Sequence, residues 1–321
     1  MDFLMKFTFL EIVTISEIRN WFYTHLNYIL GKFNWDWQIS LWWASLTLFS
    51  ILNIVFWLRT YQWYKQTSHK WMIEEKSFIK LQLFLSAGYV FVCAFRSIVP
   101  RADVQKIVIW DTWLSSIMVG RSFATIGELC LAAQLALLLN YLSKKYNSSS
   151  VRLLSFLLFP ILFMAEWFSW YSVLTTNYLG NTIEESLWCA SGVLLILSSL
   201  ILISKTTGKE KYLFGTMGFY GFLYVLFMMT IDVPMYYNRY IEDSMDGKMY
   251  YTLLQGFIEI NTNWNPTTSY IDWQGELSWM FLYFTTAVWV SLGMIRTPFL
   301  LKSFHSINFI HPFREQKKYL Q

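Results

Sequence analysis

Charged residues are scarce in this chain. Lys, Arg, Asp and Glu make up 14% of its 321 residues, whereas a soluble domain carries about 25%. Hydrophobic residues make up 55%, and the aromatic side chains comprise 17 Trp, 20 Tyr and 27 Phe, which suit a protein that needs anchors at lipid–water interfaces. So few charges exclude a soluble globule of this size and favour an integral, multi-pass membrane protein.

Cysteine and histidine are scarce as well. The three cysteines all lie in apolar runs, which excludes a disulfide framework and a Cys-rich metal site. The four histidines all lie outside the long apolar segments, at His25, His69, His305 and His311. Haem, di-iron and His-ligated zinc sites need several histidines at membrane depth, so we expect none of these cofactors and no metal site.

Seven segments are apolar enough and, at about 20 residues, long enough to span a bilayer. They are residues 40–58, 81–99, 112–139, 153–174, 186–204, 212–231 and 277–295. The last segment contains no lysine, so a retinal Schiff base is excluded too. We therefore predict an all-α polytopic membrane protein, a bundle of seven transmembrane helices.

The remaining parts of the chain differ from these spans. Residues 1–39 mix aromatic and polar side chains, which predicts an interfacial amphipathic helix before the bundle. Loop 232–276 is rich in Asp, Glu, Asn and Tyr, and we expect it to form helical or hairpin structure because long structureless loops are uncommon. The predicted division is an N-terminal segment 1–39, a transmembrane domain 40–296 and a basic tail 297–321.

The distribution of Lys and Arg predicts the orientation of the bundle. Sixteen of the 25 Lys and Arg residues lie in connections 59–80, 141–152 and 205–211 and in residues 296–321, and eight lie in the alternate connections. Because basic loops stay in the cytoplasm, we expect a cytoplasmic C-terminus and an extracytoplasmic N-terminus. The net charge of +4 thus reflects topology and leaves no surface for nucleic acid.

Three charged residues fall well inside the predicted spans, and Arg96 lies at the end of the second span. Arg121 and Glu128 lie in the third span and Glu166 lies in the fourth, and charges in such places are costly and often functional. Arg121 is expected about ten residues, or roughly 15 Å, into its span. Thr125 shares the face of Arg121 and Glu128. Since two helical turns cover about 10 Å, we expect Arg121 and Glu128 not to contact each other directly.

These residues predict a polar, aromatic-rimmed cavity in the outer half of the bundle, over an inner half nearly devoid of polar side chains. The candidate general acids and bases are Glu128, Glu166 and Asp232. The candidate ligand-binding residues are Arg96, Arg121, Thr125, Trp170, Asn177, Asn181, Glu185, Tyr236 and Arg239. The alternative interpretation is purely structural. In it, Arg121 and Glu128 form ion pairs that hold the helices together, and Glu184 and Glu185 cap the start of the fifth span.

Three functions fit this pattern. The first is an intramembrane enzyme that acts on a lipid or another amphipathic anionic substrate held by the arginines. The second is a transporter or a proton or ion pathway. The third is a non-catalytic subunit or receptor-like module that binds a protein partner through residues 1–39 or 232–276. In each case we expect contact with membrane lipids, in a bacterial inner membrane or in an organellar or plasma membrane.

Overall fold

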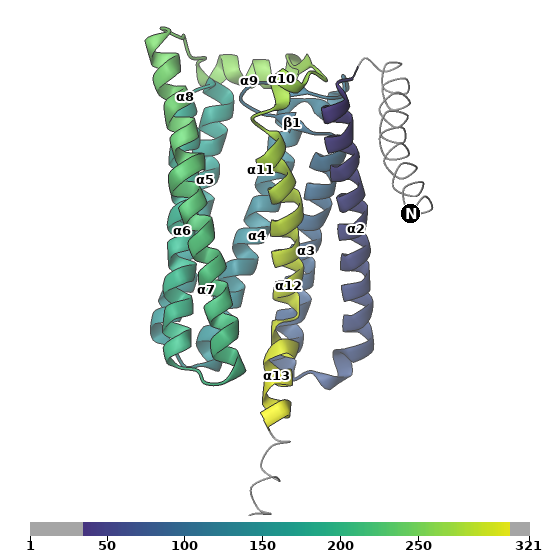
Figure 1. The fold of residues 1–321 in the computed structure, drawn as a ribbon, viewed down its shortest axis with the longest axis vertical. Helices are drawn as coiled ribbons and strands as arrows, with labels where there is room; N and C mark the ends of the chain where they lie inside the picture. Colours follow the sequence, from purple (N-terminus) through teal and green to yellow (C-terminus); the bar gives the residue numbers. More distant parts are fainter. Residues whose placement is uncertain (1–34, 309–321) are drawn as a thin grey trace, which may run out of the picture.

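In the computed structural model, the described part of the chain is a bundle of helices, seven of which are long and apolar enough to cross a membrane (Figure 1). The structure describes residues 35–308, with side chains described as far as Ser303. The predicted seven-helix membrane bundle is thus confirmed. Almost all of the predicted amphipathic segment 1–39 and the end of the basic tail lie outside the described residues.

The first five spans are single helices. They are α2 (Trp37–Thr67), α3 (Ile73–Ile98), α4 (Ile117–Lys145), α5 (Ser149–Thr175) and α6 (Tyr178–Ser204).

The sixth and seventh spans are each composed of three consecutive segments. The sixth consists of α7 (Lys209–Phe227), η3 (Met228–Asp232) and α8 (Val233–Met245), and the seventh of α11 (Leu277–Leu282), η4 (Tyr283–Ala287) and α12 (Val288–Ile295). The last described helix, α13 (Thr297–Asn308), follows α12.

Each of the helices α2 to α6 packs against the next one in the chain. The seventh span returns to the start of the bundle, where α12 packs mainly on α3 and also contacts α2 and α4. The sixth span instead packs on α6, through both α7 and α8. The sixth and seventh spans are therefore held in the bundle by different neighbours.

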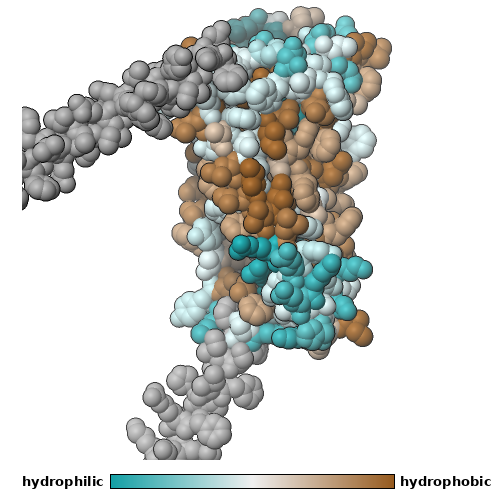
Figure 2. Space-filling model, turned by 90° about the vertical axis from the view of Figure 1, so that its right-hand side faces the viewer, coloured by the Kyte–Doolittle hydropathy of each residue, from teal (hydrophilic) through white to brown (hydrophobic). Residues whose placement is uncertain are grey.

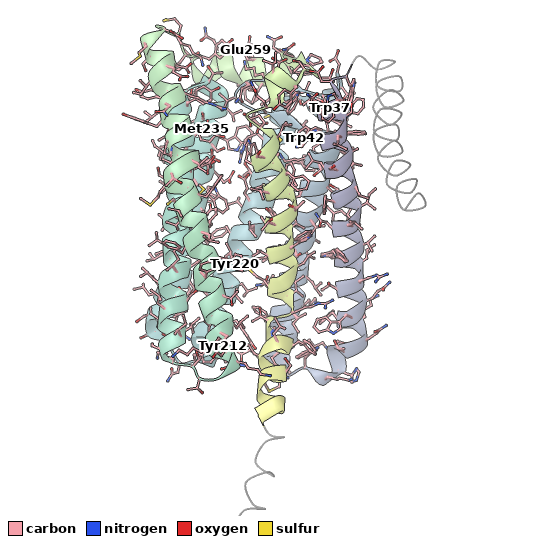
Figure 3. All side chains as sticks on the ribbon, viewed as in Figure 1. Trp37, Trp42, Tyr212, Tyr220, Met235 and Glu259 are labelled. Carbon is pink, nitrogen blue, oxygen red and sulfur yellow. The ribbon has the colours of Figure 1, made fainter. Side chains whose placement is uncertain are left out.

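The surface has the pattern that a bilayer requires. Figure 2 shows a broad apolar belt between hydrophilic ends on the face in view. Large apolar side chains such as Leu48, Phe84 and Phe156 are exposed. Trp37 lies near one end of the belt and Tyr212 near the other (Figure 3), where amphipathic rings anchor a helix. These features support a multi-pass membrane protein.

One end of the bundle, here called the capped end, is covered by loop structure. It consists of β1 (Arg101–Ala102), β2 (Ile107–Val108), η2 (Trp113–Ser115), α9 (Leu253–Thr262), β3 (Asn265–Pro266) and α10 (Tyr270–Trp273). Strand β2 pairs antiparallel with β1 and parallel with β3. Loop 232–276 thus has structure of its own, as expected, and its short strand joins the loop that follows α3.

Several helices begin away from their predicted span starts, as the second span does at Ile73 rather than residue 81, and two of these errors move charged residues of the site. The third span begins at Ile117 rather than residue 112, so Arg121 lies near the start of its helix and not ten residues into it. The fifth span begins at Tyr178 rather than residue 186, with Asn177 as its N-cap. Glu184 and Glu185 therefore lie inside a helix and do not cap it.

The sixth and seventh spans each contain one π-helical turn, η3 and η4. Such turns widen the helix and change its backbone hydrogen bonding. At η4, the side chain of Asn53 donates to the carbonyl oxygen of Phe284 at 2.9 Å and accepts from the indole nitrogen of Trp289 at 3.0 Å. Asn53 thereby satisfies a backbone group at the irregular turn.

Candidate functional site

Arg121 lies at the centre of a buried group of charges. Its Nη2 atom donates to Glu128 Oε2 at 2.5 Å and to Glu166 Oε2 at 2.9 Å. All three residues are buried. The prediction that Arg121 and Glu128 do not touch was wrong, because the long arginine side chain covers the two turns between them. The contact of Arg121 with Glu166 links α4 to α5.

Two further carboxylates and a second arginine complete the group. Arg96 Nη1 lies 3.8 Å from Glu128 Oε1, and Arg96 Nη2 lies 3.9 Å from Asp103 Oδ2. Arg121 Nη1 lies 4.0 Å from both Asp103 Oδ2 and Glu184 Oε1. We call this set the Arg–carboxylate cluster: Arg96, Asp103, Arg121, Glu128, Glu166 and Glu184.

Neutral side chains hold the carboxylates in place. Thr125 Oγ1 donates to Glu166 Oε2 at 2.7 Å and accepts from the indole nitrogen of Trp170 at 3.0 Å. The hydroxyl of Tyr283, at the start of η4, donates to Glu128 Oε1 at 3.2 Å. Thr125 and Trp170 were predicted site residues, whereas Tyr283 was not. The cluster therefore contacts α3, α4, α5, α6 and the seventh span.

The two predicted asparagines have different roles. Asn181 Nδ2 donates to Glu184 Oε2 at 3.1 Å, and the hydroxyl of Ser172 donates to Asn181 Oδ1. Asn181 thus orients a carboxylate of the cluster. The Asn177 side chain accepts from the backbone nitrogen of Leu179 at 2.9 Å, so it caps α6 and does not contact the cluster.

A second set of predicted residues lies beside the cluster. Glu185 of α6 lies near Asp232 at the end of η3, because α6 packs on η3. Both are only partly buried, and Tyr224 nearby is 37% exposed. We call Glu185, Tyr224, Asp232 and Tyr236 the lateral group. It adjoins the cluster because Glu184 and Glu185 are neighbours in α6.

Arg239 joins the sixth span to the start of the seventh. Its Nη1 atom lies 3.6 Å from Glu276 Oε1. Its guanidinium carbon lies 5.6 Å from the ring centroids of Tyr178 and Tyr236, within cation–π range. Arg239 is therefore already partnered and is not part of the Arg–carboxylate cluster.

Glu276 is a buried junction between three parts of the chain. It accepts from Gln105 Nε2 at 2.9 Å and from the indole nitrogen of Trp279 at 2.6 Å, in addition to its contact with Arg239. Burial raises the pKa of the Glu276 carboxyl, although the hydrogen bond from Trp279 and the charge of Arg239 oppose this shift.

A fourth arginine at the capped end is structural. Arg101 Nη1 donates to the carbonyl oxygens of Ser116 at 2.9 Å and Leu114 at 3.1 Å, and Nη2 donates to that of Val99 at 3.0 Å. Burial lowers the pKa of the Arg101 guanidinium to about 10, so it remains charged at neutral pH. Arg101 closes the loop between α3 and α4 rather than serving the site.

The Arg–carboxylate cluster contains more acids than bases. Two guanidinium groups of the cluster face four carboxylates, and the charge of Arg101 beside Asp103 adds a third cation, so the fully ionised cluster would still carry an excess of negative charge. Each unbalanced buried charge costs several kcal/mol. In addition, Asp103 Oδ1 and Glu166 Oε1 are buried without a hydrogen-bond partner among the described residues. Since an ionised carboxylate can only accept hydrogen bonds, this arrangement favours bound protons or cations.

A second buried polar network lies in the other half of the bundle, which was wrongly predicted to be almost free of polar residues. Gln134 Nε2 donates to Gln82 Oε1 at 2.8 Å, and the Ser291 hydroxyl donates to Gln134 Oε1 at 2.6 Å. The hydroxyls of Ser291 and Ser86 are 3.0 Å apart. The sequence did indicate this network, because Gln82 and Gln134 lie within predicted spans and an amide at that depth needs a partner. The network joins α3, α4 and α12.

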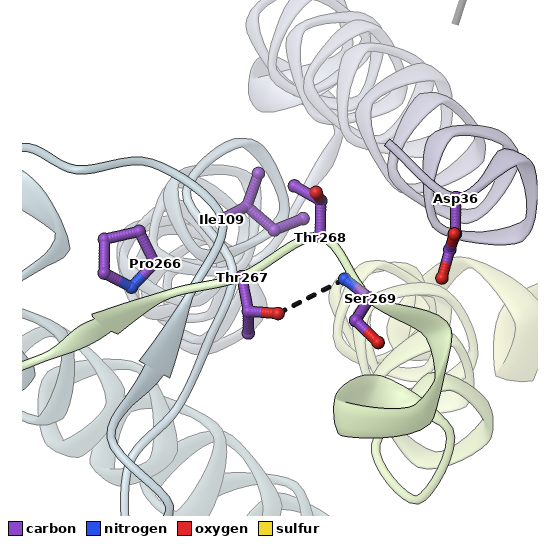
Figure 4. Close-up of a pocket in the computed structure, with 6 residues that line it drawn as sticks. All are labelled: Asp36, Ile109, Pro266, Thr267, Thr268 and Ser269. Atoms are coloured by element: carbon purple, nitrogen blue, oxygen red, sulfur yellow. Dashed lines mark hydrogen bonds between the residues drawn. The ribbon is translucent and has the colours of Figure 1, made fainter. Parts of the chain in front are cut away.

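The two cavities described in this structure lie at the capped end. The larger, of about 450 Å³, is lined by Asp36, Ile109, Pro266, Thr267, Thr268 and Ser269 (Figure 4). The smaller, of about 230 Å³, is lined by Val104, Lys106, Thr176, Lys248, Met249 and Tyr251. Neither contains a residue of the cluster or of the lateral group.

Among residues 35–308, no group of three or more His, Cys, Asp or Glu side chains is arranged to hold a metal ion. The expectation that the protein lacks haem, retinal, di-iron and His-ligated zinc stays a prediction.

Compared with models of known protein families, with curated proteins and with solved structures, the chain matches none.

Proposed function

We propose that this protein is a proton pathway, in which the Arg–carboxylate cluster binds and releases protons as they cross the membrane. The observation that carries the proposal is the excess of four buried carboxylates over two arginines. A proton on one of these carboxyls removes an unbalanced charge without any other change in the cluster. The site is therefore suited to gain and lose protons.

Glu128 and Glu166 are the best candidates for the proton carriers. Both contact the same nitrogen, Arg121 Nη2, and the more distant Arg96 lies 3.8 Å from Glu128, so Arg121 is the near cationic group that the two carboxylates share. When two carboxylates share a site in this way, protons are lost in steps that belong to the pair. Arg121 stays charged and keeps one member of the pair ionised while the other exchanges its proton.

The predicted enzyme with an anionic substrate is less well supported by this geometry. It requires Arg96 or Arg121 to bind an anionic head group. Both guanidinium groups are already in contact with carboxylates of the protein. An anion would have to displace these carboxylates and would add to an existing excess of negative charge. We therefore favour the proton pathway over the enzyme.

The test is proton flux into liposomes that contain the purified protein and a pH-sensitive dye in their lumen. With an imposed potential, we expect the intact protein to carry protons and Glu128→Gln and Glu166→Gln to lower the rate at least about tenfold. The control is Glu74→Gln, because Glu74 is exposed and pairs with Lys144 at 3.6 Å, far along the helices from the cluster. Flux equal to that of empty liposomes would contradict the proposal.

A further inference from the structure

We propose that protons pass between the Arg–carboxylate cluster and the other half of the bundle through the hydroxyl groups of Tyr283 and Tyr89. This inference rests on the proposed proton pathway and names its route through the middle of the membrane. Tyr89 is the connecting residue, because it lies on α3 between the cluster and the second buried polar network. We call that network the Gln134 network: Gln82, Ser86, Gln134 and Ser291.

One face of α3 carries polar side chains along most of the helix. Residues spaced by three, four and seven positions share a helix face, and six polar residues of α3 follow this spacing. All six are buried: Glu75, Gln82, Ser86, Tyr89, Cys93 and Arg96. Arg96 belongs to the cluster, and Glu75 pairs with Lys302 at 2.6 Å near the opposite end of the bundle. The face therefore leads from the cluster through the apolar belt.

The hydroxyl of Tyr283 is the first step away from the cluster. It donates to Glu128 Oε1 at 3.2 Å. Its ring packs edge-on against the ring of Tyr89, with the ring centroids 5.9 Å apart. Tyr283 is also the first residue of the π-helical turn η4, and turns of this kind recur at functional sites. Because a hydroxyl both donates and accepts, Tyr283 can exchange a proton with Glu128.

The hydroxyl of Tyr89 is the observation that carries the route. Tyr89 is fully buried, and its hydroxyl faces Tyr283 and Cys93 without forming a hydrogen bond within the described part of the chain. A buried hydroxyl without a partner is costly, so packing alone does not explain a tyrosine where phenylalanine would fill the same space. A proton relay explains it, since a relay needs a group that is free to accept and to donate.

The Gln134 network continues the route beyond Tyr89. Ser86 lies three residues before Tyr89 on the same face of α3, about 4.5 Å away along the helix axis, and one water molecule can bridge hydroxyls at such a separation. The hydroxyl of Ser86 is 3.0 Å from that of Ser291. Ser291 in turn donates to Gln134 Oε1 at 2.6 Å. The two serines carry the route further, and the amide of Gln134 orients them.

Each step of the relay moves one proton and leaves no charge behind. In the direction that the structure shows, Tyr283 gives its proton to Glu128 and takes the proton of Tyr89, which takes one from the side of Ser86. At each hydroxyl one O–H bond forms as another breaks. The hydroxyls then rotate back, and one proton has entered at Ser86 for each proton that reaches Glu128.

The experiment measures proton flux in the liposomes described above, with variants that each remove one hydroxyl. Tyr89→Phe and Tyr283→Phe keep the ring and delete the relay, so each should lower the rate at least about tenfold. The matched control is Tyr220→Phe, because Tyr220 of α7 is exposed on the surface (Figure 3). Ser291→Ala should also lower the rate. Ser198→Ala should not, because this buried hydroxyl donates to a carbonyl of its own helix.

A second measurement separates a broken route from a damaged cluster. The infrared carbonyl stretch of a protonated carboxyl reports on the cluster itself, and Tyr89→Phe should leave this band unchanged. The same variant removes a buried hydroxyl that lacks a partner, so its unfolding temperature should be at least that of the intact protein. If one variant misfolds, the other two hydroxyl deletions on the route still test it.

The expected result is lower flux in Tyr89→Phe with the infrared band and the unfolding temperature retained. Flux that depends on Glu128 but is unchanged in Tyr89→Phe would overturn the route and leave the proposed proton pathway standing. Lower flux together with loss of the band would also overturn it, because Tyr89 would then act on the charge of the cluster. An intact protein with no more flux than empty liposomes would refute the pathway and the route together.

Discussion

Individual side chains decide how this protein tolerates charge inside a membrane. Arg121, Glu128, Glu166, Thr125 and Trp170 were all predicted site residues and lie together, because charges in apolar spans need partners, but the direct contact of Arg121 with Glu128 was not predicted. Asp103 and Tyr283 also lie at the cluster, although neither was among the predicted site residues. Asp103 lies in a loop, where carboxylates are common, and no local pattern shows which of the 20 tyrosines points inward.

Gly120 permits the close packing of Arg101 at the capped end. A Cβ atom at Gly120 would lie 2.1 Å from Arg101 Cδ, so Gly120→Ala should destabilise the protein by about 1–3 kcal/mol through overpacking. Gly215 of α7 has open space around it, and Gly215→Ala should stabilise its helix by about 0.5–1 kcal/mol. Thermal unfolding in detergent compares the two variants. Equal effects on the unfolding temperature would refute this account of Gly120.

The buried carboxyl of Glu276 should make stability depend on pH. Because burial raises its folded-state pKa, protonation favours the folded state. The contribution of Glu276 is therefore fully present below the ordinary glutamate pKa of about 4.3 and is lost as the pH rises through the raised value. Glu276→Gln should flatten this part of the profile of unfolding temperature against pH.

Glu259 provides a contrast of opposite sign. Hydrogen bonds from Asn263 and Lys106 lower its pKa, so its contribution is present at neutral pH and is lost as the pH falls through the lowered value. If Glu276→Gln and Glu259→Gln changed the pH profile in the same direction, the assignment of Glu276 as a buried, hard-to-ionise acid would be wrong.

At the scale of helices, the number of spans was predictable and their ends were not. Apolar length identifies the spans, but polar residues at a helix end do not show whether the helix stops there. Residues 178–185 contain Asn181 and two glutamates, and they are helical because these side chains are directed to partners inside the bundle. The sixth span continues beyond Asp232 as α8, which packs on α6 although none of its residues is fully buried.

The network around Gln134 should hold three helices together. Gln134→Leu leaves the amide of Gln82 buried without its side-chain partner, which costs about 1–3 kcal/mol. The double variant Gln82→Leu with Gln134→Leu removes both amides and should cost less than the sum of the single changes. Unfolding free energies of the single and double variants give the coupling. Simple additivity would show that the two amides do not stabilise each other.

At the scale of the whole molecule, the alternation of Lys and Arg along the chain predicts an extracytoplasmic capped end. We therefore propose that residue 244 faces the outside and residue 70 the cytoplasm. Ser244→Cys and Lys70→Cys place one thiol at each end, both at exposed positions, in a background without the native cysteines. A membrane-impermeant maleimide added to intact cells should label the first and not the second. The reverse pattern would overturn the orientation.

The central claim is that the Arg–carboxylate cluster holds protons at neutral pH, because its acids outnumber its arginines. Infrared spectroscopy tests it most directly, since a protonated carboxyl has a carbonyl stretch that an ionised one lacks. The intact protein at neutral pH should show this band, Glu74→Gln should retain it, and the double variant Glu128→Gln with Glu166→Gln should lose part of it. An intact protein without the band, or a double variant with an unchanged band, would contradict the claim.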